Sequence, residues 1–390
     1  MTGYLASVDI DFSDPEFIRD PYPALAALRE RAPVSWHPPT GTWLAASHAA
    51  AGAVLRDRRL GRFWTDREPA GRYEPFNLLH RNQMMENEPP VHTRLRSLVA
   101  KAFGRGHVER LRPAVAAEAA ALLGAAGQEF DLLAEVAEPL AVTVIAELLG
   151  VPVELAPQLR AWSQAIVRMY EVAPSEEIER AAVRAAAEFA EVIRALARER
   201  AERPAADLVT DLVAAQDGEA RLTEDEVVAS AVLLLNAGHE ASVNVFGNGL
   251  VALLRSGRVP TPDQVPSCVE EMLRFDSALQ LFERTATAPV TVGDVTVEPG
   301  QRVAALLGAA NRDPAVFDDP DEFRPDREPN PHLAFGAGVH FCVGAPLARM
   351  ELVESLGLLL RRLPGLQLVG DPVSRGTFVL RGYSSVTVGC

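Results

Sequence analysis

Cys342 is the residue of this chain whose chemistry depends most on its surroundings. It lies in the glycine-rich run FGAGVHFCVGAPLARMELVESL, residues 335–356, which leads directly into a segment with helical spacing of apolar side chains. A thiol placed just before a helix faces free backbone N–H groups and the positive end of the helix dipole, which lower its pKa. Gly336, Gly338 and Gly344 would let a flat or bulky group approach the backbone closely. This setting suits a nucleophile or a metal ligand equally.

A packed core thiol and one half of a disulfide are the other roles open to Cys342. Three cysteines, the others being Cys268 and Cys390, are too few and too odd a set for a disulfide framework. His340 is only weak evidence for the base of a nucleophile, and no C-x2-C pair exists for a zinc site. For an isolated cysteine, a packed core thiol is the ordinary case.

The elements that must position Cys342 are mostly helices. Apolar spacing and helix-rich composition predict helices at 22–31, 92–103, 108–124, 139–149, 176–200, 223–255, 262–275 and 345–363. Short strands are expected at 33–38, 42–46, 290–297, 302–307 and 377–388, the third as a hairpin with Gly293-Asp294 at its turn. Without a long linker or an internal repeat, residues 1–390 are expected to form a single, mainly α domain with a small β-rich region.

The helix expected at 223–255 is unusually long. Thr223 and Glu226 fit a capping box at its start, and its length would be roughly 50 Å. Gly247 and Gly249 in its apolar interior are best explained by close helix packing. A carboxylate at Glu240 inside such a helix is costly when unpaired, so it needs a partner, a water or a task.

Composition excludes several classes of function. The chain has 390 residues with a net charge of −15, which opposes binding to nucleic acid and to anionic membranes. No basic segment followed by an apolar segment marks a signal peptide, and no run of about 18 apolar residues would span a bilayer. We therefore expect a cytoplasmic protein in a reducing compartment, with no nucleic-acid partner and no membrane insertion.

The run from Phe335 to Gly344 resembles the haem-thiolate signature of the cytochrome P450 family. That signature is F-x-x-G-x-H-x-C-x-G, and every fixed position is matched here. The resemblance covers almost the whole chain and implies the P450 fold, with a long central helix I. It implies that haem b (iron protoporphyrin IX) is the cofactor, with Cys342 as the axial metal ligand. It also assigns Phe335, Gly336, His340 and Gly344 to the haem-binding loop.

Other family marks occur in the expected order. Glu271 and Arg274 match the E-x-x-R motif of helix K, and Arg324 stands where the family supplies a third member of that ion network. Three further residues match the arginine and histidine donors that hold the haem propionates, together with His340; they are His92, Arg96 and Arg284.

Helix I departs from the family pattern at one position. The usual A-G-x-[DE]-T appears here as Ala237-Gly238-His239-Glu240-Ala241, followed by Ser242. Ala237 and Gly238 are then cofactor contacts, and Glu240, Ala241 and Ser242 are the candidate catalytic positions. The missing threonine normally helps to deliver protons to dioxygen, so either ordered water or a hydroxyl of the substrate is expected to replace it. His239 is expected to be structural.

The resemblance implies a monooxygenase of secondary metabolism, of the kind used in antibiotic biosynthesis. It would oxidise, most simply hydroxylate, a bulky hydrophobic natural product with O2. Two electrons would come from NAD(P)H through a ferredoxin reductase and a ferredoxin. Two alternatives stay open, namely oxidative C–C or C–N coupling without oxygen insertion and a haem protein that binds a ligand without turnover.

Two surfaces follow from the same resemblance. The substrate pocket is expected between residues 76–90, which include Met84 and Met85, residues 169–170, the middle of the long helix, residues 279–282 and residues 378–380. A basic patch that would attract an acidic ferredoxin is expected on the cysteine side of the haem, from Arg94, Lys101, Arg105 and Arg349.

Overall fold

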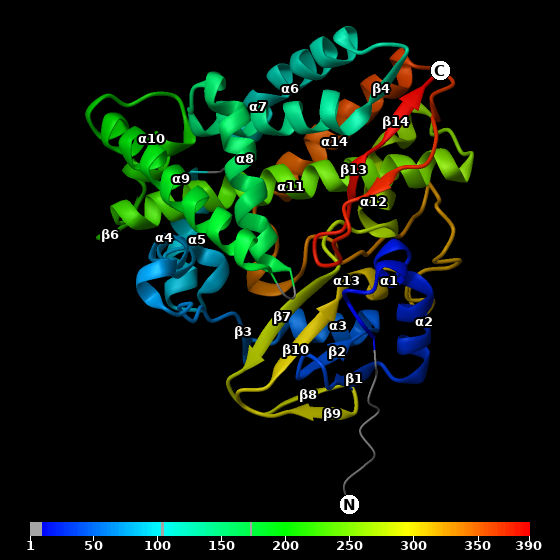
Figure 1. The fold of residues 1–390 in the computed structure, drawn as a ribbon, viewed down its shortest axis with the longest axis horizontal. Helices are drawn as coiled ribbons and strands as arrows, with labels where there is room; N and C mark the ends of the chain where they lie inside the picture. Colours follow the sequence, from blue (N-terminus) through cyan, green and yellow to red (C-terminus); the bar gives the residue numbers. More distant parts are fainter. Residues whose placement is uncertain (1–9, 103–104, 172–173) are drawn as a thin grey trace, which may run out of the picture.

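The computed structural model describes residues 10–102, 105–171 and 174–390. Most helices gather in one part of the molecule, and the main β-sheet lies at one side of them (Figure 1). The longer helices are α2 (Tyr22–Arg31), α3 (His48–Arg56), α4 (Ala70–Arg81), α5 (Val91–Ala102), α6 (Arg105–Ala125), α7 (Glu138–Leu149), α8 (Ala156–Val167), α9 (Glu176–Glu202), α11 (Glu224–Ser256), α12 (Val265–Phe275) and α14 (Ala345–Arg362). Shorter helices are α1 (Pro15–Arg19), α10 (Leu208–Ala214) and α13 (Leu307–Ala310), and single turns are η1 (Met84–Glu86), η2 (Leu133–Ala137), η3 (Val153–Leu155), η4 (Arg168–Tyr170), η5 (Pro262–Gln264) and η6 (Gly338–His340).

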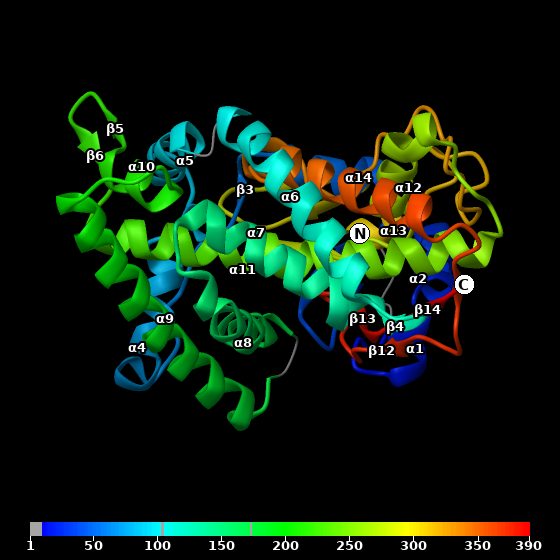
Figure 2. The ribbon, with the colours of Figure 1, turned by 90° about the horizontal axis from the view of Figure 1, so that it is seen from above.

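Helix α11 crosses the molecule and is buried along most of its length (Figure 2). It begins with the predicted capping box, in which the Thr223 hydroxyl accepts from the Glu226 N–H and the Glu226 carboxylate accepts from the Thr223 N–H. A Cβ atom built on Gly249 would lie 2.4 Å from the Cβ of Met272 on α12, and one on Gly247 would lie 2.9 Å from Leu133. The prediction that these glycines permit close helix packing is confirmed.

Five strands form the main sheet, in the order β1-β2-β10-β7-β3. Strand β10 pairs in parallel with β2, and the other neighbours are antiparallel. The remaining strands form a three-stranded sheet, β11-β14-β4, and three two-stranded pairs. The strands are β1 (Val34–His37), β2 (Thr42–Ala45), β3 (Leu60–Gly61), β4 (Glu129–Asp131), β5 (Gln216–Asp217), β6 (Ala220–Arg221), β7 (Leu281–Ala286), β8 (Val290–Val292), β9 (Val295–Val297), β10 (Arg302–Leu306), β11 (Gln367–Leu368), β12 (Val373–Ser374), β13 (Tyr383–Ser385) and β14 (Thr387–Gly389).

The sequence-based helices and most strands are confirmed. The last residue of the helix expected at 92–103 lies outside the described residues, and the helix expected at 262–275 opens with the separate turn η5. The hairpin of β8 and β9 has Gly293 at its turn, with φ of 56°. The strand expected over 377–388 is wrong in its first half, which is a loop joined to the sheet region by a single bridge between Leu279 and Leu380.

A buried ion network fixes the chain that leads to the cysteine loop. Glu271 and Arg274 on α12 are fully buried, and two guanidinium nitrogens of Arg274 donate to the two Glu271 oxygens at 2.7 Å. The third member of the network is Arg327, whose Nε lies 3.0 Å from Glu271 Oε2. Arg324, which the sequence suggested for this role, contributes its backbone N–H at 2.9 Å, so the assignment to its side chain is wrong. Arg327 lies three residues further along the chain, and its side chain is buried.

Candidate active site

The loop before Cys342 has a backbone that requires glycine. Gly336 and Gly338 adopt φ values of 69° and 71°, in the left-handed region. A Cβ atom on Gly338 would lie 2.3 Å from the backbone carbonyl oxygen of Leu55 at the end of α3, so no side chain fits there. The Cys342 N–H donates to the carbonyl of Phe335 at 3.0 Å, which closes the loop on itself. The sulfur is thereby held at a fixed point just before α14.

The thiol of Cys342 is partly buried, and all three cysteines of the chain are free. Burial raises the pKa of Cys342, although the backbone N–H groups of Gly344 and Ala345 and the charge of Arg96 act in the opposite direction. The prediction of a lowered pKa is therefore wrong for the protein alone, because desolvation outweighs the helix N-terminus. A bound metal cation would reverse this balance, since a thiol that coordinates a metal is deprotonated.

The structure places three of the four predicted propionate donors at the cysteine loop, and the fourth, Arg284, near Glu88, which pairs with His340. His92 and Arg96 come from α5, His340 from η6 and Arg284 from β7. The rings of His92 and His340 lie 4.4 Å apart, and Arg96 donates to the carbonyl of Phe341 at 2.6 Å. These contacts join α5 to the cysteine loop.

Glu88 neutralises part of this donor set, because its Oε1 lies 2.7 Å from Nε2 of His340, but two of the donors have depressed pKa values. Burial, together with the nearby charge of Arg62, lowers the pKa of Arg284 to about 10. Burial, followed by the charges of His340 and Arg96, lowers the pKa of His92 to about 4. Among the described residues, His92 Nε2 has no hydrogen-bond partner. A ligand with two carboxylates would satisfy these donors, which is the form of a haem.

Cys342 cannot hold a metal ion with protein ligands alone in the part of the chain that the structure describes. No group of three or more His, Cys, Asp or Glu residues there is arranged around a common point. A metal bound at the Cys342 sulfur would need its other ligands from a prosthetic group, as an iron porphyrin supplies them. The residues present therefore fit a haem with a thiolate ligand.

Three residues at the centre of helix α11 are less buried than their neighbours. Ala237 is exposed, and Gly238 and Ala241 are half-buried, within a helix whose other central residues are buried. Ala237 and Ala241 are separated by four residues and share one face. This face carries no hydroxyl group, because the position that matches the family threonine is an alanine.

Glu240 is buried and has the partner that its burial requires. Its Oε2 lies 2.5 Å from Nη1 of Arg375. The other terminal nitrogen of Arg375, Nη2, lies 3.3 Å from Oε1 of Glu138 on α7. Arg375 comes from the loop after β12, so the centre of α11 is joined by charge to the C-terminal part of the chain. His239 is buried beside it, and burial lowers the pKa of His239 to about 4, so it is neutral.

Ser242 lies on a different side of α11, at a small closed cavity. The cavity has a volume of about 10 Å³ and is lined by Ser242, by Glu351 and Ser355 of α14, and by apolar side chains. This volume is near the ~10–15 Å³ that a single water needs. Burial raises the pKa of Glu351 to about 8, so its carboxyl group is largely protonated at neutral pH. Sequence analysis missed Glu351, because a lone glutamate on an amphipathic helix is ordinarily a surface residue.

Three segments predicted to line the substrate pocket meet in the structure. Tyr170 of η4 shares a hydrogen bond of 3.0 Å with Nε2 of His80 on α4. The next residue, Glu171, accepts hydrogen bonds from the N–H groups of Val379 and Leu380 at 3.4 and 3.2 Å. Residues 76–90, 169–171 and 378–380 therefore adjoin one another. Met84 is buried in the hydrophobic cluster that contains Phe76 and Leu79 of α4, and Met85 is partly buried against that cluster.

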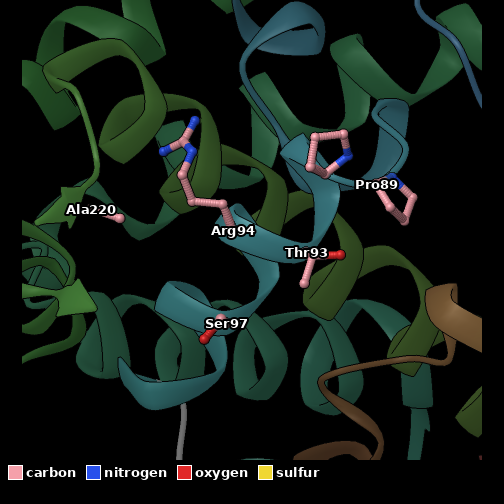
Figure 3. Close-up of a pocket in the computed structure, with 6 residues that line it drawn as sticks. Pro89, Thr93, Arg94, Ser97 and Ala220 are labelled. Carbon is pink, nitrogen blue, oxygen red and sulfur yellow. The ribbon is translucent and has the colours of Figure 1, made fainter. Parts of the chain in front are cut away.

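The expected basic patch is largely neutralised where the structure describes it. Arg94 lines a surface groove with Pro89, Thr93, Ser97 and Ala220 (Figure 3), and its guanidinium pairs with Glu226 at the start of α11. Arg349 pairs with Glu270 instead of standing free. Lys101 is exposed, and the side chain of Arg105 lies outside what the structure describes.

In the described part of the chain, no helix combines the length and apolar content needed to cross a membrane.

Comparisons with known proteins identify the family to which the chain is similar. The family model for "Cytochrome P450" matches residues 265–366, which include the buried ion network and the cysteine loop. The chain is 40% identical over 356 residues to a mycinamicin IV hydroxylase/epoxidase of Micromonospora griseorubida, covering 87% of each protein. It is also 40% identical to a nocardicin C N-oxygenase of Nocardia uniformis subsp. tsuyamanensis, covering 93% of this chain and 92% of that protein.

A similar fold occurs among solved structures. The crystal structure of P450BioI, in complex with an acyl carrier protein ligated to hexadec-9Z-enoic acid, superposes with a TM-score of 0.90. The sequences are 30% identical, and the match covers 96% of this chain and 99% of that one. The arrangement of α11, α14 and the main sheet is thus that of a known family.

Proposed function

Because this chain belongs to the cytochrome P450 family and is a monooxygenase of that family, we propose that it inserts oxygen into a bulky, hydrophobic natural product. The relatives named above act on mycinamicin IV and on nocardicin C, and on that ground the substrate is a product of secondary metabolism of comparable size. The oxidation belongs to antibiotic or related biosynthesis in the cytoplasm. Residues 1–390 act as one catalytic unit.

A haem is held from both sides in this proposal. Cys342 would ligate the iron, and the loop residues Phe335, Gly336 and Gly344 would contact the haem next to it. On the other side, Ala237 and Gly238 of α11 leave open space for substrate. The haem supplies the activation of dioxygen when it is bound.

The propionates of that haem bind His92, Arg96, Arg284 and His340. The observation that carries the proposal is this cluster of buried and half-buried donors around the Cys342 loop, with His92 Nε2 left without a described partner. Each donor would gain a charge-assisted hydrogen bond to a carboxylate, which is stronger than a neutral one. The depressed pKa values of His92 and Arg284 would then rise toward their ordinary values, because the added negative charges favour the protonated forms.

Proton delivery is the step in which this chain differs from the usual family pattern. The open face of α11 carries Ala241, so the chain offers no hydroxyl there, and a hydroxyl of the substrate is the proposed replacement. Glu240 is held as a partner of Arg375, which limits its movement toward that face. Glu351 and Ser242 offer a second source, because Glu351 holds a proton at neutral pH and shares a water-sized cavity with the Ser242 hydroxyl.

Electrons are proposed to come from NAD(P)H through a ferredoxin reductase and a ferredoxin. Reduced ferredoxin would dock where Cys342 and the exposed ring of Phe341 come nearest to the surface. Since Arg94 and Arg349 are already paired with glutamates, a large basic patch is not the basis of this docking.

Product analysis tests the proposal. The holoprotein is supplied with ferredoxin, ferredoxin reductase, NADPH and candidate macrolide or peptide-derived substrates under isotopically heavy dioxygen. The expected product is heavier by one oxygen atom that carries the label. A product that has lost two hydrogen atoms would indicate oxidative coupling instead. Binding of all candidates without any product would favour a ligand-binding haem protein.

A further inference from the structure

Glu270 and Arg349 form a bidentate ion pair between α12 and α14. Arg349 Nε lies 2.6 Å from Glu270 Oε1, and Arg349 Nη2 lies 2.8 Å from Glu270 Oε2. His332 adds a third contact, with Nε2 at 3.0 Å from Glu270 Oε2. Although burial opposes it, the hydrogen bonds from Arg349 and His332 hold the pKa of Glu270 down at about 2. The guanidinium therefore has one well-defined position.

This guanidinium lies against the cysteine loop. Its central carbon is 4.5 Å from the centre of the Phe335 ring, within the range of a cation–π contact. The backbone carbonyl of Phe335 accepts a hydrogen bond from the Cys342 N–H at 3.0 Å, so the residue that carries this ring is bonded directly to the cysteine backbone. The charge of Arg349 also acts on the thiol of Cys342 and favours its ionised form.

We propose that Glu270 and Arg349 are positioning residues that hold one positive charge beside the Cys342 loop and thereby set the reduction potential of the bound haem. On the proposed function, in which Cys342 ligates the iron, this pair replaces the role in ferredoxin docking that the sequence suggested for Arg349. Glu270 partly neutralises the charge of Arg349 and fixes the position of its guanidinium. That guanidinium lies beside the cysteine loop.

The sign of the effect follows from electrostatics. Reduction adds an electron to the haem, so a nearby cation stabilises the reduced state and a nearby anion destabilises it. Removing the charge of Arg349 should lower the potential. Removing the charge of Glu270 should raise it, because the guanidinium is then no longer neutralised. A merely structural pair would not produce shifts of opposite sign.

The test uses the purified holoprotein and spectroelectrochemical titration of the haem. Arg349→Gln is expected to lower the reduction potential, Glu270→Gln to raise it, and the double variant to fall between the two. Arg349→Lys keeps the charge and should stay closer to wild type than Arg349→Gln. Circular dichroism and thermal melting of each variant show whether the fold is retained.

The pair of Arg112 and Glu354 provides a matched control. It also joins α14 to another helix, with side chains 42% and 26% exposed against 38% and 28% for Arg349 and Glu270. Arg112→Gln and Glu354→Gln make the same charge changes further along α14 and should give clearly smaller shifts. Shifts at Glu270 and Arg349 that share one sign, or that do not exceed the control, would overturn the inference.

The wild type separates this inference from the proposed function. Its reduced, CO-bound form should show the long-wavelength Soret band of a haem-thiolate protein. Absence of that band would contradict the assignment of Cys342 as ligand. Presence of the band with unmoved potentials in the variants would contradict only the role of Glu270 and Arg349.

Discussion

Ser242 and Glu351 face the same water-sized cavity between α11 and α14, although they are more than 100 residues apart in the chain. Ser355 completes its polar lining, and its hydroxyl has no hydrogen-bond partner among the described residues. A buried carboxyl group next to an unsatisfied hydroxyl is a costly arrangement that a bound water would relieve. It sets a protonated carboxyl group beside Ser242, the residue that follows Ala241 in α11.

Removing the carboxyl group of Glu351 or the hydroxyl group of Ser242 should impair proton delivery. In Glu351→Gln and Ser242→Ala, we expect NADPH consumption to continue while the fraction recovered as product falls and peroxide rises. A well-placed general acid contributes roughly 10²- to 10⁴-fold in rate, so the loss of coupling should be large if this route is the main one. Product and peroxide are measured against NADPH in the same assay. Coupling equal to wild type in both variants would assign proton delivery to another route.

Glu351 should also make stability depend on pH. Its pKa is raised by burial from 4.5 to about 8, so the folded state holds the proton more tightly than the unfolded state between these values. The stability contributed by the neutral carboxyl is complete below pH 4.5 and declines as the pH rises toward 8. The side chain of Glu351→Gln stays neutral at every pH. The melting temperature of this variant, relative to that of wild type, should therefore increase as the pH rises through this interval. Glu354→Gln on the same helix serves as the control, and an equal gain there would contradict the assignment.

Cys342→Ser tests the iron ligand directly. The variant should lose the long-wavelength Soret band of the reduced CO complex, because an alcohol cannot replace the thiolate electronically. Cys268→Ser is the control, since Cys268 is buried in α12 within an apolar cluster. Retention of the band in Cys342→Ser, or its loss in the control, would refute the ligand assignment.

Substrate analogues test whether the substrate supplies the hydroxyl that Ala241 lacks. Analogues that lack one particular hydroxyl should bind and still consume NADPH, but most electrons should end as peroxide or water. Ala241→Thr should either restore coupling with these analogues or crowd the native substrate out of the pocket. A deoxy analogue turned over with wild-type coupling rules out assistance by the substrate and leaves Ser242 and Glu351 as the donors.

The buried network around Glu271 predicts unequal costs for two nearby arginines. Arg327→Ala leaves part of the Glu271 charge unpaired in the core and should destabilise the protein by about 3–5 kcal/mol. Arg324→Ala keeps the backbone hydrogen bond to Glu271 and should cost much less. Chemical denaturation of both variants gives the comparison. Equal destabilisation would mean that the Arg324 side chain also carries the network.

Sequence patterns predicted the long helix and the cysteine loop because strong local signals determine both. The capping box at Thr223 and the left-handed glycines at 336 and 338 act over a few residues and are readable from the chain. Helices α3, α4 and α8 were missed because short length, an interior Pro75 and an early Pro157 weaken their periodicity. These are elements that tertiary packing stabilises more than intrinsic propensity does.

Contacts between distant segments could not be predicted in the same way. The partner of Glu240 is Arg375, and that of Arg349 is Glu270, and no periodicity connects these positions. The raised pKa of Cys342 depends on burial, which the adjacent helix start does not reveal. The choice of Arg327 over Arg324 depends on which of two nearby side chains points inward.

The loop after β12 performs two tasks within six residues. Arg375 holds Glu240 at the centre of α11, and Val379 and Leu380 donate to Glu171 at the wall of the proposed substrate pocket. Substitutions made here to admit a different substrate would also disturb the position of an acid in the helix that faces the haem. Efforts to broaden the substrate range should therefore begin at residues 84–85, where the walls can change shape without altering the charge balance of α11.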